Sequence, residues 1–218
     1  MLVNIYVAFI GIAFLSSLNA FRLDLPLHLK IFSLLLACDL VVEVCSTFLL
    51  GPVFHMRSNV QFYNVFMLVE YFTYAWFYRT ILKNRLLRRL IGAYLILFPI
   101  FWFVAVFFVF GFDHWNSYLS IVGSFFTVCM AVAFYYQLFT APQLTRLTVS
   151  PEFWISTGVI IFYTCNLPYL GMLNFITKEY LPLARKLLML LQVLNIIMYS
   201  LFTLAFLCRT RTMKLSSY

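Results

Sequence analysis

The chain alternates long apolar stretches with short polar loops, and this alternation predicts its secondary structure. An α-helix needs about 20 apolar residues to cross a hydrocarbon core about 30 Å thick. Stretches of this kind cover residues 3–20, 29–50, 60–82, 90–111, 117–140, 152–176 and 185–207. The loops between them are too short to hold a soluble domain. The pattern therefore predicts an all-α fold, a polytopic bundle of seven transmembrane helices that forms one domain over residues 1–218.

Lysines and arginines gather at alternate ends of these stretches, and their distribution predicts the orientation. One side holds Arg22, Lys30, Arg79, Lys83, Arg85, Arg88, Arg89, Arg146, Arg209, Arg211 and Lys214. The other side holds only Arg57, Lys178, Arg185 and Lys186. The more basic side is expected in the cytoplasm, which puts the N-terminus outside and the C-terminus inside. A cleaved signal peptide in the first stretch would invert this order, but the stretch lacks a preceding basic segment.

The composition supports a membrane protein and argues against a nucleic-acid partner. The chain is 64% hydrophobic and 10% charged, whereas a soluble domain is about half apolar and about a quarter charged. Its formal charge of +8 comes from basic residues placed at the ends of apolar stretches. That placement is typical of a protein in contact with a lipid bilayer. The sequence leaves the oligomeric state open. The five cysteines are isolated and are expected to be small packing residues.

Three acids lie deep inside apolar sequence, and they are the main candidates for function. Asp39 and Glu43 are four residues apart in the second stretch, so they share one helix face. Glu70 lies in the third stretch. Counting 1.5 Å per residue from each end, Asp39 and Glu70 both lie about 15 Å deep, near the midplane. Acids at this depth are costly, so they indicate a functional site.

Several other polar residues are predicted to face the same interior. The candidate ligand- or ion-binding set is Asp39, Glu43, Asn64, Glu70, Tyr74, Asn166, Gln192 and Asn195. No lysine or arginine lies at the depth of the acids. The carboxyl groups must then be protonated, hydrogen-bonded to tyrosine and asparagine, or bound to a cation. The alternative is that they act only as hydrogen-bonding contacts between helices.

Several established site types are not expected here. A retinal protein would need a lysine in the middle of the last stretch, but Lys186 lies at its end. A zinc hydrolase would need histidine or cysteine ligands at depth, but the histidines fall in or beside loops. A serine hydrolase would need a histidine at membrane depth to activate its serine, and the sequence places no histidine there. No metal, no cofactor and no catalytic residue are therefore predicted.

Two motifs resemble a known family. The run from Tyr63 through Asn64 to Phe66 opens the third stretch, and Phe153, Trp154, Ile155, Ser156, Gly158 and Tyr163 open the sixth. With the acid-bearing second stretch, they resemble a family of uncharacterised small seven-helix integral membrane proteins common in Bacteroidota. The resemblance implies a location in the bacterial inner (cytoplasmic) membrane. It implies no particular activity.

Three functions remain open. The first is a sensing or signal-relay module that acts through a membrane or cytoplasmic protein partner. The second is a proton- or cation-coupled transporter or channel that uses the acids. A weaker alternative is a lipid-processing enzyme with paired membrane carboxylates. At the inner face, Arg79, Lys83, Arg85, Arg88 and Arg89 are expected to contact a protein partner or anionic lipid, or else only to fix the topology.

Overall fold

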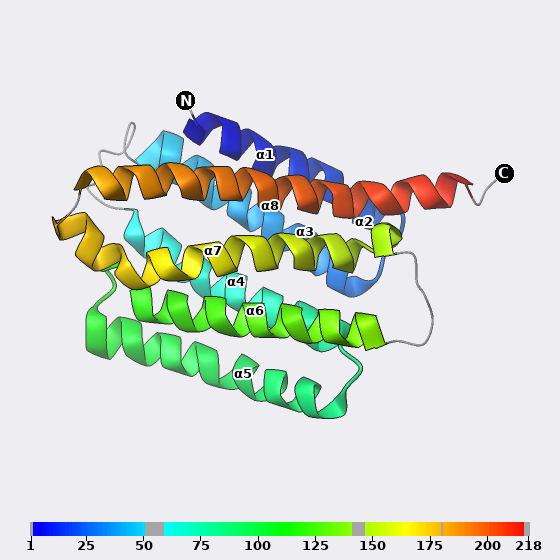
Figure 1. Ribbon diagram of the computed structural model, residues 1–218, viewed down its shortest axis with the longest axis horizontal. Helices are drawn as coiled ribbons and strands as arrows, with labels where there is room; N and C mark the ends of the chain where they lie inside the picture. The colour runs from blue at the N-terminus through cyan, green and yellow to red at the C-terminus, as the bar shows by residue number, and fades with distance from the viewer. Residues whose placement is uncertain (1, 51–58, 141–146, 180, 216–218) are drawn as a thin grey trace.

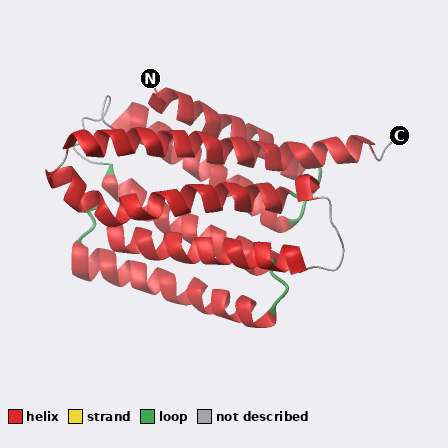
Figure 2. Ribbon diagram, viewed as in Figure 1, coloured by secondary structure: helices red, strands yellow, loops and turns green. Residues whose placement is uncertain are grey.

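The computed structural model describes residues 2–50, 59–140, 147–179 and 181–215. Within these ranges the chain forms helices and connecting loops and no strand (Figure 2). The helices are α1 (Leu2–Ser17), α2 (Asn19–Arg22), α3 (Leu27–Val44), α4 (Val60–Ile81), α5 (Arg85–Val104), α6 (Ser117–Thr140), α7 (Pro151–Glu179) and α8 (Leu181–Leu215). Two π-helical turns, η1 (Cys45–Leu50) and η2 (Ala105–Phe110), extend α3 and α5, and a short 3₁₀ helix, η3 (Leu147–Val149), precedes α7. The prediction of an all-α fold is confirmed.

The long helices lie side by side along one axis, and the chain runs back and forth between the two ends of the bundle (Figure 1). Helix α1 packs against α3 and α8, while α7 packs against α6 and α8. Helix α4 contacts α3, α5 and α6, which places it inside the bundle. Helix α5 lies at the edge, as Figure 1 shows.

Among the described residues, five helical segments are long and apolar enough to cross a membrane: Leu2–Arg22, Leu27–Phe48, Arg85–Phe110, Ser117–Thr140 and Lys186–Cys208. Their outward surfaces carry large apolar side chains, with Phe108 76% exposed and Ile96 67% exposed. A soluble protein rarely exposes so much contiguous apolar surface, so this surface suits hydrocarbon. Helix α4 has 22 residues but is more polar, because buried Asn64, Tyr71 and Tyr78 face its neighbours. The exposed face of α4 is apolar, with Phe62, Val65 and Phe72 on it.

Helix α5 begins at Arg85, five residues before the predicted stretch that starts at 90. Asn84 caps it, because its Oδ1 accepts hydrogen bonds from the backbone N–H of Leu86 at 2.8 Å and of Leu87 at 3.3 Å. The boundary prediction failed because a search for apolar residues excludes the arginines of the first turn. In the structure, Arg85, Arg88 and Arg89 therefore lie on the first turns of α5 and not in a loop.

An aromatic layer fills the centre of the bundle and joins helices that do not pack closely backbone to backbone. The Phe32 ring of α3 lies 5.1 Å from the Phe202 ring of α8, edge to face. The Tyr163 ring of α7 lies 5.6 Å from Tyr74 of α4 in the same geometry. Such pairs stabilise beyond the area that they bury. Helices α3 and α4 therefore face α7 and α8 across large side chains.

One charged contact lies outside the apolar spans. Asp24 has a φ of 45°, in the left-handed region that aspartate and asparagine adopt more readily than most residues. Its carboxylate accepts a hydrogen bond from Lys30 Nζ, and that bond with the lysine charge lowers the pKa of Asp24. The pair therefore stabilises the fold above the unfolded pKa of about 4, and the contribution is lost as pH falls. Asp24→Asn removes this surface contribution and keeps the backbone preference.

Candidate functional site

A cavity of about 130 Å³ lies inside the bundle, between α3, α4, α7 and α8. Its polar lining includes Asp39, Glu70, Tyr163, Asn166, Asn195 and Tyr199. This volume holds several water molecules or a small ion, and it is too small for a drug-sized ligand. Four of the predicted candidates, two acids and two asparagines, are thus brought together on one cavity. They come from four different helices.

Each of the two acids on the cavity is bound to a tyrosine from the opposite side of the bundle. The Tyr199 hydroxyl of α8 donates to Asp39 Oδ2 of α3. The Tyr163 hydroxyl of α7 donates to Glu70 Oε1 of α4 at 2.5 Å. Asp39, Tyr163 and Tyr199 are all buried. These two carboxyl–tyrosine bonds therefore join α3 to α8 and α4 to α7.

Glu43 lies outside this cavity, one helical turn after Asp39. Its Oε2 accepts hydrogen bonds from the Tyr6 hydroxyl at 2.5 Å and from the Tyr63 hydroxyl at 3.2 Å. It thereby links α3 to α1 and α4. In the part of the chain that the structure describes, no three His, Cys, Asp or Glu side chains group closely enough to hold a metal ion. The acids thus form two neighbouring sites and not one shared ligand set.

Two polar atoms on the cavity have no partner among the described residues. Asn166 Oδ1 and Trp115 Nε1 are both buried and make no hydrogen bond there. One is an acceptor and the other a donor, so they match the hydrogen-bonding capacity of a water molecule or a small polar species. Buried polar groups normally have a partner. These atoms offer a donor and an acceptor to a small polar species in the cavity.

The other predicted candidates lie elsewhere. Asn64 Nδ2 donates to the carbonyl oxygens of Phe112 and His114, both at 3.0 Å, and fixes the loop before α6. Tyr74 is buried in the aromatic layer beside Tyr163. Gln192 is partly buried, and it is not among the residues that line the cavity. These three residues support the site or the fold from outside the cavity.

The tyrosines that hold the acids are the main feature absent from the predicted set. Tyr199 follows Asn195 by four residues, so the two share a helix face, and this spacing was a usable signal. Tyr163 belongs to the motif that opens the sixth stretch. Tyr6 gave no such signal, because its partner Glu43 is 37 residues away in the sequence. The sequence could show which residues share a face but not which faces meet.

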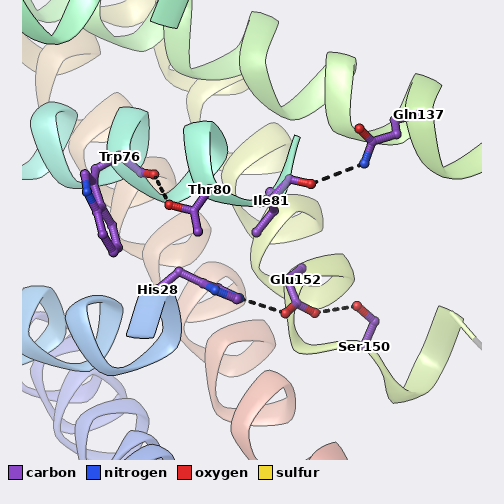
Figure 3. Close-up of polar contacts among 7 residues, drawn as sticks. All are labelled: His28, Trp76, Thr80, Ile81, Gln137, Ser150 and Glu152. Carbon is purple, nitrogen blue, oxygen red and sulfur yellow. Dashed lines mark hydrogen bonds and ion pairs between the residues drawn. The ribbon is translucent and has the colours of Figure 1, made fainter. Parts of the chain in front are cut away.

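At the opposite end of the bundle from Glu43, a second polar cluster joins α3 to α7 (Figure 3). His28 Nε2 lies 2.9 Å from Glu152 Oε1. The Ser150 hydroxyl donates to Glu152 Oε2 at 2.6 Å. Helix α7 begins at Pro151, one residue before the predicted stretch, and Glu152 lies in its first turn. The same end holds Gln137, whose Nε2 donates to the carbonyl oxygen of Ile81 at 3.3 Å.

The basic residues between α4 and α5 divide into two groups. Arg79, Arg85, Arg88 and Arg89 line one cleft. Lys83 is exposed and does not line it, and its backbone N–H donates to Gln137 Oε1 at 2.6 Å.

Comparison with known proteins found no matching family model, no similar curated protein and no similar solved structure. The resemblance to the small seven-helix family therefore stays a prediction.

Proposed function

We propose that the protein is an integral membrane module that binds a proton, or a small cation in its place, at the Asp39–Glu70 cavity and relays this state to a partner. The observation that carries the proposal is the pair of carboxyl–tyrosine bonds around the cavity. In this proposal seven helices span the membrane, with the N-terminus outside and the C-terminus inside. The membrane is taken to be a bacterial inner membrane, as the family resemblance implies.

The mechanism follows from the strength of the two bonds. A hydrogen bond to an ionised carboxylate is about twice as strong as one to a neutral acid. Protonation of Asp39 therefore weakens its bond to Tyr199, and protonation of Glu70 weakens its bond to Tyr163. A cation that occupies the carboxylate oxygens acts in the same direction. Since each bond joins two helices, a change of charge at the cavity changes how firmly α3 holds α8 and α4 holds α7.

In this mechanism, helix α8 transmits the change at the cavity to the partner protein. This helix has 35 residues, or about 52 Å at 1.5 Å per residue, against a hydrocarbon core of about 30 Å. Its C-terminal end extends beyond the other helices of the bundle (Figure 1). Tyr199 lies within the same continuous helix. A rigid helix that carries one bond partner at mid-bundle and projects from one end can transmit a small shift to a partner protein.

A second candidate, proton or cation transport, is favoured by polar contacts spaced along the bundle. Glu43 with its tyrosines lies toward one end, the Tyr78 hydroxyl donates to Ser156 Oγ at 3.2 Å on the other side of the cavity, and Glu152 binds His28 beyond it. Such a series resembles a proton relay.

The test uses purified protein in proteoliposomes and in detergent. For the relay module, we expect no flux of H⁺, Na⁺ or K⁺ under a gradient, and a pH- or cation-dependent shift of the thermal midpoint that Glu70→Gln reduces. The amide keeps the shape of the side chain, so folding should survive. Asp113→Asn is the matched control, because Asp113 is exposed and does not line the cavity. A flux that Glu70→Gln abolishes would mean transport and not relay, and a midpoint shift that Glu70→Gln leaves unchanged would refute both.

A further inference from the structure

Four arginines converge where α4 ends and α5 begins. Arg85, Arg88 and Arg89 stand at spacings of three and four on one face of α5, and Arg79 reaches them from the last turn of α4. Together they line a cleft of about 420 Å³. The sequence predicted a basic loop here, but the structure shows a shaped basic site on two rigid helices.

The cleft holds positive charge without a balancing acid. The ion pairs of the described chain join His28 to Glu152 and Lys30 to Asp24, and neither involves an arginine of the cleft. The side chains of the four arginines are exposed. Like charges at such close spacing repel one another. The arrangement is therefore incomplete until an anion lies among them.

Gly92 shapes the back of the cleft. It lies one turn after Arg88 and Arg89 on the same face of α5. A Cβ atom at this position would lie 3.7 Å from both Cζ and Nε of Arg79. The Arg79 guanidinium thus lies close to α5 at Gly92, on the face that carries Arg88 and Arg89. A guanidinium has the planar fork that binds a phosphate through two hydrogen bonds.

An apolar stripe leads along α4 to this cleft. Exposed Phe62, Val65, Val69 and Phe72 follow one another at spacings of three and four, and Arg79 continues the same face. Phe62, Val65 and Val69 of this stripe also line an apolar groove of about 590 Å³ between α3 and α4. Val69 is ten residues from Arg79, or about 15 Å, which is half of the hydrocarbon core. An acyl chain anchored at the cleft therefore ends at the groove.

We propose that Arg79, Arg85, Arg88 and Arg89 bind the phosphate group of an anionic phospholipid, with an acyl chain lying along the α4 stripe. The charge of the cleft selects the anionic headgroup, and the stripe distinguishes a lipid from free phosphate. The site is separate from the acid cavity, so this inference does not depend on the proposed relay.

The experiment measures lipid binding to the full chain by native mass spectrometry. The protein is released from nanodiscs of phosphatidylglycerol and phosphatidylcholine, and the apparent dissociation constant of the first phosphatidylglycerol adduct is compared between variants. A charge-assisted hydrogen bond to the phosphate contributes about tenfold in affinity, so Arg79→Gln with Arg88→Gln should weaken binding by about 100-fold. Lys83→Gln is the control for diffuse charge, because Lys83 belongs to the same connection but does not line the cleft. Through diffuse attraction alone, it should weaken binding by about fivefold at most.

Two outcomes would overturn the proposal. An equal loss in Lys83→Gln and in the arginine variants would mean that only diffuse surface charge attracts the lipid. Release of phosphatidylglycerol by inorganic phosphate at a comparable concentration would mean that the cleft takes a soluble phosphate. The variants should elute from size exclusion as the unmodified protein does, since the four side chains are exposed and support no described core contact.

Discussion

Gly123→Ala should destabilise the bundle by about 1–3 kcal/mol, the usual cost of forcing extra volume into a packed interior. A Cβ atom at position 123 of α6 would lie 2.2 Å from Cδ2 and 2.3 Å from Cε2 of the Tyr71 ring on α4, which is too close for a real contact. The ring cannot move freely, because its hydroxyl lies 2.8 Å from Ser124 Oγ and donates to the carbonyl oxygen of Ser120 at 3.1 Å. Small residues of this kind let membrane helices approach closely.

The matched control for this prediction is Gly11→Ala in α1. A Cβ atom there would meet only Leu40 Cδ1 at 4.0 Å, an ordinary contact. Alanine in a helix interior is favoured over glycine by about 0.5–1 kcal/mol, so this variant should be neutral or slightly more stable. Thermal unfolding in detergent compares the two. Equal midpoints for both variants would show that the close contact between α4 and α6 is not needed for stability.

Tyr199→Phe should cost about 1–3 kcal/mol, because it leaves a buried carboxyl group without its hydrogen-bond donor. The ring stays in place, and Phe202 still meets it edge to face at 5.8 Å. Only the bond to Asp39 is lost. Tyr136→Phe is the control, since Tyr136 is 72% exposed and the loss of its hydroxyl should have little effect.

A double-mutant cycle isolates the contact between the two residues. Asp39→Asn combined with Tyr199→Phe should be less destabilising than the sum of the single changes, by about 0.5–3 kcal/mol. The same cycle on Glu70 and Tyr163 should give a coupling of the same sign. Additive effects in both cycles would show that the tyrosine hydroxyls do not stabilise the carboxyl groups. That result would contradict the relay mechanism.

Hydrophobic pattern predicted the helices well wherever a stretch was apolar from end to end. Helix α6 occupies the predicted 117–140, and α4 differs from its stretch by one residue. The pattern failed at ends where polar residues continue the helix. Arg85 to Arg89 form the first turns of α5, and α8 runs past its predicted end at 207 to Leu215. Backbone hydrogen bonds and caps set these ends, and hydropathy does not report them.

The candidate site was predictable in part. Counting residues from the helix ends predicted one membrane depth for Asp39 and Glu70, and both acids line one cavity. Glu43 shares a helix face with Asp39, yet it binds Tyr6 and Tyr63 one turn away. Which helix faces which depends on packing of the whole bundle, and one sequence does not contain that information in any local pattern.

The central claim is that the charge at the cavity controls how α3 holds α8. Spin labels at Leu34 and Leu204 test it most directly, because both side chains are exposed and lie five residues from Asp39 and Tyr199 toward the same end. The distance between the labels is measured in lipid at alkaline and at acidic pH, in a background without native cysteines. The relay predicts a short, narrow distance at alkaline pH that lengthens or broadens on acidification, and an Asp39→Asn variant that stays in the second state at both. A distribution that pH does not change in the unmodified protein, or that changes equally in Asp39→Asn, would contradict it.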